Sequence, residues 1–306
     1  MIFKYYGGAD EAVEVEYGQG QGVQVGVEDC GELVGYVDDG AYSYANADPL
    51  VLSTVLTRKY RMLEDWMNNN KLVINPDKTH LMVMASRGKA PLRRQVSMMA
   101  GTFCIKPSET ETLLGGHVHQ TLQWNQHISD HKCSLIRQLT GRVNGLKQIA
   151  RTATFSTRLM IANGAIMSKL VYLITVWGGA SQYLLKAVQV KQLDAARTVC
   201  GFNSWGWSRR RLLKKVGWMS VRQLVFFHTV LQTFKTITTG LPKPLHASLP
   251  TDHPYLTRNA AVGNIRFNET FISTNTFKYR AMTWYNSVPS SVKSGKLASV
   301  KRKLRI

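Results

Sequence analysis

Cysteine is scarce in this sequence, and the pattern of the few cysteines excludes two kinds of small scaffold. The 306 residues contain 4 cysteines, and no two of them form a Cys-x-x-Cys pair. Single thiols that lie far apart build neither a disulfide framework nor a zinc ribbon. We therefore expect Cys30, Cys104, Cys133 and Cys200 to be reduced.

Long apolar runs are also missing, as is a secretory signal. The longest apolar stretch lies near 170–177, which is too short to cross a bilayer. Residues 1–10 lack the basic start and the apolar core of a signal peptide. The sequence thus predicts a soluble intracellular protein, cytoplasmic or nuclear, that does not associate with membranes.

Acidic residues are rare in the second part of the chain. Residues 1–111 hold 11 Lys+Arg against 15 Asp+Glu, a net charge of −4, whereas residues 112–306 hold 28 against 4, a net charge of +24. A region this basic repels itself and attracts a polyanion. A solvated basic face explains a mild excess of charge but not one so uneven, so we expect nucleic acid as the partner.

The first part of the chain has strand and hairpin signals. Glycines interrupt residues 1–32, for which we predict a loosely structured segment. Two β-prone runs between 33 and 44 flank Asp38-Asp39-Gly40, and Asp-Gly between such runs predicts a hairpin. Asp48 and Pro49 predict a helix start, with the helix ending at 68–70. We predict strands at 71–75 and 80–85, joined by a turn at Pro76-Asp77. An exposed loop at 88–102 follows, and then a hairpin at 113–124 that bends near Gly115-Gly116.

The second part of the chain has helical patterns. Apolar residues recur at helical spacing over 135–150, 157–177 and 184–200, and a basic helical region spans 209–235. The sequence therefore predicts an α+β fold, in which a domain of hairpins and one helix (33–125) follows residues 1–32. Two helical regions, 126–203 and 204–306, complete the chain.

Paired aspartates are the first candidate for chemistry. Carboxylates on a tight turn hold divalent metal beside phosphates, because Mg²⁺ prefers carboxylate and phosphate oxygens. Neighbouring strand residues point to opposite faces, so we expect Asp38, more than Asp39, to face the metal. The alternative is an ordinary Asp-Gly turn.

Several motifs in order resemble the reverse transcriptases of non-LTR retrotransposons. Tyr36-Val37-Asp38-Asp39 matches the (Y/F)xDD motif of these enzymes. The segment from Trp66 to Thr79 resembles the part of their palm domain that ends in a D-K-T turn, and 113–128 resembles their primer-grip hairpin. Residues 170–178 and 192–197 resemble the thumb and the region after it, and 284–289 resembles a closing W-x-N-x-(L/V)-P element.

The resemblance implies RNA-directed DNA synthesis, a nucleotidyltransferase reaction assisted by Mg²⁺. Its expected partners are an RNA template, a DNA primer and deoxynucleoside triphosphates. Residues 33–125 would form a partial palm with the primer grip, 126–203 a helical thumb and 204–306 a basic helical extension. The resemblance assigns metal binding and catalysis to Asp38 and Asp39, the triphosphate to Lys78, and the primer grip to Leu114, Gly115 and Gly116. Lys78 is equally consistent with a solvated turn lysine.

The chain also departs from the family pattern. These polymerases need another metal-binding aspartate on a strand before the YxDD motif, followed by a PQG-type turn, and neither is recognisable here. Asp10 is the one early candidate, although Gly7-Gly8-Ala9 does not resemble a buried strand. We therefore expect a truncated enzyme, without fingers or endonuclease, whose two-metal site is incomplete.

The last candidates are a basic cluster and a weak zinc pattern. Tryptophans at 205, 207 and 218 bracket five cations, an arrangement suited to nucleic acid: Arg209, Arg210, Arg211, Lys214 and Lys215. The alternative is an amphipathic helix with the tryptophans in the core. His127, His131 and Cys133 have zinc-like spacing but lack a fourth ligand. Residues 293–305 form a basic tail, which is suited either to holding RNA or to addressing the nucleus. Two readings compete with a polymerase: a non-catalytic nucleic-acid-binding module and a decayed element copy.

Overall fold

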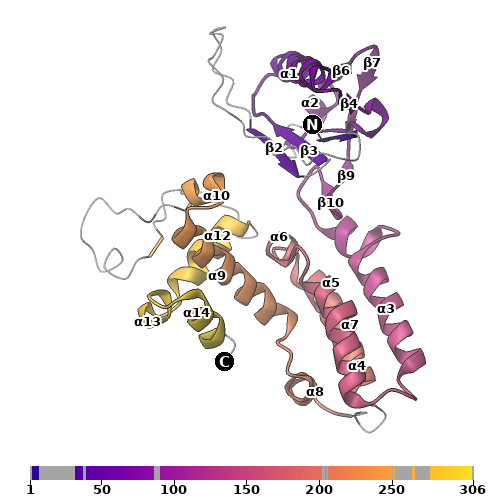
Figure 1. Cartoon of the computed structure of the whole chain (residues 1–306), viewed down its shortest axis with the longest axis vertical. Coiled ribbons are helices and arrows are strands. Elements are labelled where there is room, and N and C mark those ends of the chain that lie inside the picture. The colour runs from indigo at the N-terminus through magenta and orange to yellow at the C-terminus, as the bar shows by residue number, and fades with distance from the viewer. Residues whose placement is uncertain are drawn as a thin grey trace. The chain divides into compact units, whose positions relative to one another are not determined.

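The structure is a computed structural model of the chain, shown in Figure 1. It describes residues 2–6, 32–36, 39–85, 90–201, 204, 206–249, 251, 264–265 and 276–304. The fold is mixed α+β and divides into two compact units: unit 1 spans 1–123 and unit 2 spans 124–306. Among the described residues, no helix is long and apolar enough to cross a membrane.

Unit 1 contains a four-stranded antiparallel sheet in the order β2-β3-β1-β4. Its strands are β1 (Ile2–Tyr6), β2 (Glu32–Tyr36), β3 (Asp39–Ser43) and β4 (Val73–Ile74). β2 and β3 form the expected hairpin, in which Tyr36 pairs with Asp39. The prediction of a loose segment over 1–32 is wrong for β1, which lies between β3 and β4; hydrogen bonds from both neighbours fix a strand that local sequence did not indicate.

Helix α1 (Pro49–Asn69) confirms the predicted start and end. The Asp48 carboxylate accepts a hydrogen bond from the Leu50 N–H at 2.8 Å, and Pro49 occupies the first turn. The helix buries Val55, Leu56, Tyr60 and Met67, which recur at helical spacing, and the last three belong to a core cluster of unit 1.

The described part of unit 1 also contains three small two-stranded sheets, the 3₁₀-helix η1 (Pro76–Lys78) and the short helix α2 (Ala90–Arg93). The sheets pair β5 (Leu81–Met82) with β8 (Pro107–Ser108), β6 (Met98–Ala100) with β7 (Phe103–Ile105), and β9 (Thr110–Leu113) with β10 (Gly116–His119). The strands on either side of Pro76-Asp77 exist but do not pair with each other: β4 pairs with β1 and β5 with β8.

The prediction of an exposed loop at 88–102 is wrong for residues 96–100. Val96, Met98 and Ala100 are buried, and β6 lies along α1. The Ser53 and Thr57 hydroxyls of α1 accept hydrogen bonds from backbone N–H groups of residues 97 and 99, at 3.2 and 3.1 Å. Basic residues at the start of this segment favoured the interpretation as a loop, although alternate residues of β6 are buried.

Unit 2 is helical. Its first elements are the π-helix η3 (Gln126–Asp130), α3 (Leu135–Ile149), α4 (Phe155–Ile161), the π-helix η4 (Ala162–Met167), α5 (Ser168–Val171) and α6 (Ile174–Trp177). Next come α7 (Gln182–Cys200), α8 (Arg209–Val216), α9 (Val221–Thr239) and α10 (Lys243–Ala247). The last are α12 (Phe277–Asn286), α13 (Ser290–Lys293) and α14 (Leu297–Lys303).

The single helix predicted over 157–177 is broken. Leu173 adopts φ 54°, a left-handed conformation, and separates α5 from α6. The fully buried Trp177 donates its indole N–H to the Tyr172 carbonyl at 2.9 Å, which closes this bend. Apolar periodicity continues across the break because both short helices bury residues in the same core.

Candidate nucleic-acid interface

Helix α8 separates its charges from its apolar residues. Ser208 caps the helix by accepting from the Arg211 N–H at 3.3 Å, and Gly217, at φ 69°, ends it. Leu212, Leu213 and Val216 are buried. The five predicted cations are all exposed: Arg209, Arg210, Arg211, Lys214 and Lys215. The helix is therefore anchored by one face and presents a cationic surface on the other.

The aromatic residues around α8 are structural. Trp207 and Trp218 are partly buried and pack against the core of unit 2. The Arg211 guanidinium lies 4.2 Å from the Trp207 ring centroid, so it covers that ring. The Trp218 indole donates to the Asn163 side-chain oxygen at 2.8 Å. Trp205 lies outside the described residues. The surface of α8 is thus suited to phosphates more than to stacked bases.

Two glutamines of α7, missed as site residues by sequence reasoning, position the turn that follows α8. Gln192 is fully buried and donates to the Met219 carbonyl at 2.8 Å. Gln189 accepts from the Val221 N–H at 2.9 Å and donates to the Gln192 side chain at 2.7 Å. Buried amides at i and i+3 that tie two helices together are stable only when their hydrogen bonds are made. Their spacing among the apolar residues that α7 buries was the available signal.

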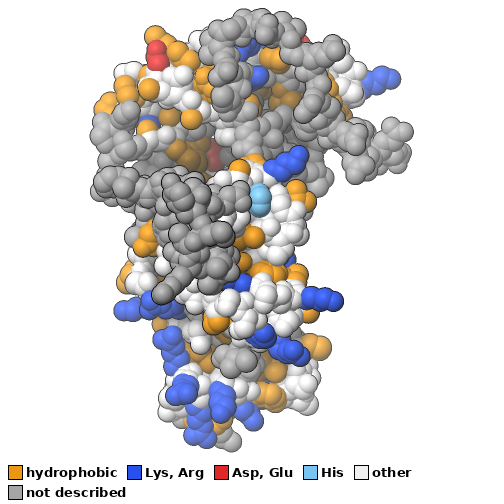
Figure 2. Space-filling model, turned by 90° about the vertical axis from the view of Figure 1, so that its left-hand side faces the viewer, with side chains coloured by type: hydrophobic (Ala, Val, Ile, Leu, Met, Phe, Trp, Pro, Cys, Tyr) orange, Lys and Arg blue, Asp and Glu red, His pale blue; other side chains and the backbone are white. Residues whose placement is uncertain are grey.

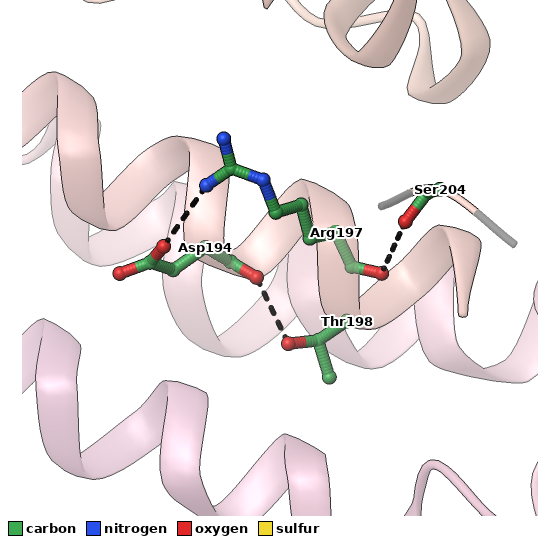
Figure 3. Close-up of polar contacts among 4 residues, drawn as sticks. All are labelled: Asp194, Arg197, Thr198 and Ser204. Carbon is green, nitrogen blue, oxygen red and sulfur yellow. Dashed lines mark hydrogen bonds and ion pairs between the residues drawn. The ribbon is translucent and has the colours of Figure 1, made fainter. Parts of the chain in front are cut away.

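Few acidic groups oppose these cations. Of the four acidic residues in unit 2, the structure describes Asp130 and Asp194. Figure 3 shows that Arg197 approaches Asp194 within the same helix, at 3.2 Å. On the face seen in Figure 2, several Lys and Arg side chains lie in the lower part, at the level of α8 in Figure 1, among hydrophobic and other side chains, and no coloured acidic side chain is visible there.

Charges from two helices also converge beside Cys200 at the end of α7. Burial raises the pKa of this thiol, while Lys215 of α8 and Arg158 of α4 act in the opposite direction. Lys215 lies 5.5 Å from the Phe155 ring centroid, and Arg158 donates to the Ala150 carbonyl at 2.8 Å. One cation of α8 and one of α4 therefore lie beside this thiol.

The structure describes one of the two paired aspartates of unit 1. Asp38 lies outside the described residues, and Asp39 is the first residue of β3. Asp39 pairs with Tyr36 on one side and with Lys4 of β1 on the other. The two-metal mechanism that the resemblance implies needs a further carboxylate beside Asp38 and Asp39. β1 contains no Asp or Glu, and Glu32 of β2 pairs with Ser43, at the opposite end of β3 from Asp39. The described residues contain no group of three metal-binding side chains.

Lys78 is the last residue of η1, which follows β4 along the chain and contacts β1. Asn75 caps this turn: its side chain accepts from the Asp77 N–H at 2.9 Å, and its carbonyl accepts from the Thr79 hydroxyl at 3.0 Å. Lys78 is exposed. The same sheet thus carries Asp39 and leads to the Lys78 turn, with β1 between them.

The predicted primer-grip hairpin is present as a hairpin. Leu113 pairs with Gly116, and Leu114 and Gly115 form the turn with φ 47° and 74°. Two consecutive positive φ values define the hairpin turn that matches strand twist, which explains the glycine at 115. Leu114 is exposed and Gly116 is buried.

The zinc pattern does not assemble. His127 is buried, and the His131 ring nitrogen accepts from the Cys133 N–H at 3.0 Å. Among the described residues, these side chains form no metal-binding group.

Comparison with known proteins adds no relative: no protein-family model, no curated protein and no solved structure matches this chain.

Proposed function

We propose that this chain binds nucleic acid through unit 2 and corresponds to the palm and thumb of a reverse transcriptase of the non-LTR retrotransposon type. The exposed cationic face of α8, within a unit of net charge +24, is the observation that carries the binding function. The motifs from Tyr36 to Pro289 carry the resemblance to the enzyme family. An RNA template paired with a DNA primer is the corresponding ligand.

Binding at α8 follows from phosphate chemistry. Guanidinium groups form forked hydrogen bonds with phosphate oxygens, and each neutralised phosphate releases counterions. The Arg211 guanidinium covers the Trp207 ring, and the exposed residues of α8 are cations, so we expect contact with the phosphate backbone. Unit 2 should therefore bind with weak sequence preference and strong salt dependence.

Replacing Arg209, Arg210 and Arg211 by glutamine tests this interface, because it removes charge and leaves the buried anchor of α8 intact. If each arginine contacts one phosphate, the slope of log affinity against log salt falls by about 0.9 per contact, or about 2.7 for three. Between about 1 M and 0.1 M salt, that difference grows to roughly 500-fold in Kd. Fluorescence anisotropy with a labelled RNA–DNA hybrid measures both quantities.

The matched control replaces three exposed cations of other helices by glutamine: Arg137 of α3, Lys235 of α9 and Lys243 of α10. It lowers the net charge of unit 2 by the same amount. We expect a much smaller change in slope than for the α8 variant. Equal slopes in the two variants would show that binding follows total charge and not the α8 surface.

Catalysis is the second candidate function, favoured by the β2–β3 hairpin that carries Asp39. The carboxylate-free β1 argues that this chain by itself binds a primer–template without extending it. Asp38→Asn should leave hybrid binding unchanged. Primer extension by the wild-type chain, abolished in Asp38→Asn, would contradict the incomplete site and establish a polymerase. Loss of binding in a folded Asp38→Asn chain would contradict the assigned roles.

A decayed copy would behave differently from either function. Both units have buried core clusters, so we expect a monodisperse protein that unfolds cooperatively. Aggregation at all salt concentrations would instead favour decay.

A further inference from the structure

Two cations of unit 2 outside α8 converge on the π-helix η4. The Arg142 side chain, from α3, donates to the Ala165 carbonyl of η4. Lys169 of α5 follows Ala165 by four residues, which is about one helical turn along the same side. Burial lowers the pKa of Lys169, and the nearby Arg142 charge lowers it further. The two positive groups therefore share one local surface.

The π-helix creates this arrangement. Its turns are wider than those of an α-helix, which alters the regular backbone hydrogen bonds. Two side chains donate to backbone carbonyls of η4: Ser168 to the Gly164 carbonyl and Arg142 to the Ala165 carbonyl. Single π-turns within α-helices are often found at functional sites. One N–H of Arg142 donates to the backbone. A guanidinium has five N–H donors, so this hydrogen bond does not use all of them.

Lys169 is oriented as well. Its ammonium lies 5.4 Å from the ring centroid of Tyr172, and this ring is partly exposed. Among the described residues, neither Arg142 nor Lys169 has a carboxylate partner. Two like charges held together without a counter-ion raise the energy of the free protein, and an anion placed beside both would relieve that repulsion.

We propose that Arg142 and Lys169 bind a backbone phosphate of nucleic acid, as a second contact distinct from α8. This proposal rests on nucleic-acid binding by unit 2. The π-helix also connects the two regions, because Asn163 of η4 accepts from Trp218 in the turn after α8. A forked guanidinium beside an ammonium suits the several oxygens of a phosphate.

The test is the Arg142→Gln/Lys169→Gln variant, assayed by anisotropy with the same labelled RNA–DNA hybrid. Because the two side chains are proposed to share one phosphate, their loss should lower the salt slope by about 0.9. The control Lys235→Gln/Lys243→Gln removes two exposed cations from α9 and α10 and should keep the wild-type slope within error. Lys169→Arg retains the charge and should retain the slope, which separates charge from a packing effect.

The outcomes distinguish this proposal from the proposed function. A wild-type chain that does not bind the hybrid overturns both. A wild-type chain that binds, an α8 variant that loses affinity and an Arg142→Gln/Lys169→Gln variant with an unchanged slope overturn only the second contact. If the double variant no longer melts cooperatively, Lys169→Gln alone gives the answer: its slope should fall, by no more than about 0.9, and an unchanged slope would overturn the contact. Polyglutamate that competes as well as the hybrid, at equal charge, would show a site for carboxylates and overturn the assignment to phosphate.

Discussion

Gly178 follows α6 where three helices meet, and its replacement by alanine tests how closely they are packed. A Cβ atom at this position would lie 2.6 Å from Val225 Cγ1 of α9 and 2.9 Å from Arg280 Nη1 of α12, and it would also collide with the Ile174 carbonyl. Two of these neighbours cannot move away easily. The Ile174 oxygen is backbone, and Val225 is a buried β-branched residue with one favoured rotamer in a helix.

Arg280 makes the third contact costly. Its side chain is buried, with one N–H donating to the Thr175 carbonyl at 2.8 Å and another to the Thr276 carbonyl at 3.3 Å. Burial lowers the pKa of Arg280 to about 10. Displacement would break hydrogen bonds to a buried charged group, which are more costly to lose than neutral ones.

The expected loss of stability in Gly178→Ala follows from two opposing effects. Overpacking a well-packed core costs about 1–3 kcal/mol, and the rigid neighbours place this site near the upper end. Replacing glycine recovers about 0.4–1 kcal/mol by restricting the unfolded chain. We expect Gly178→Ala to destabilise unit 2 by about 2 kcal/mol, which lowers Tm by roughly 4–8 °C for a domain of this size.

Gly145→Ala is the matched control. Gly145 is an exposed residue within α3, and a Cβ atom there would meet nothing within 4 Å. Alanine in an exposed helix is favoured over glycine by about 0.5–1 kcal/mol, so Tm should rise by roughly 1–4 °C. Thermal denaturation followed by circular dichroism measures both variants. A Gly178→Ala protein that melts at or above the wild-type temperature would refute the close packing described here.

Two further predictions concern α9 and α7. Ser220 caps α9 in a capping box with Gln223, so Ser220→Ala should lower the free energy of unfolding by about 1 kcal/mol in urea denaturation, and an unchanged midpoint would contradict the cap. Burial raises the pKa of the Cys200 thiol despite Lys215 and Arg158, and this keeps it protonated at neutral pH. Iodoacetamide should therefore modify Cys200 more slowly than the exposed Cys104 and Cys133, with the difference lost in denaturant; equal rates in the folded protein would contradict this environment.

The amino-acid sequence by itself determined the features that depend on neighbouring residues. Asp48 and Pro49 located the start of α1, because capping needs only a side chain and the adjacent backbone. The Gly115 hairpin was predictable for the same reason, since a positive φ is a local requirement. The charge imbalance was also readable directly, because it is a sum over residues and needs no coordinates.

Tertiary structure alone decided the features that depend on distant residues. Strand β1 forms because β3 and β4 supply its hydrogen bonds, although they follow it by more than thirty residues in the chain. The break at Leu173 and the pairing of Arg142 with η4 likewise depend on how helices pack. Local sequence does not encode such contacts, since the free energy that stabilises them comes from burial and hydrogen bonding between elements.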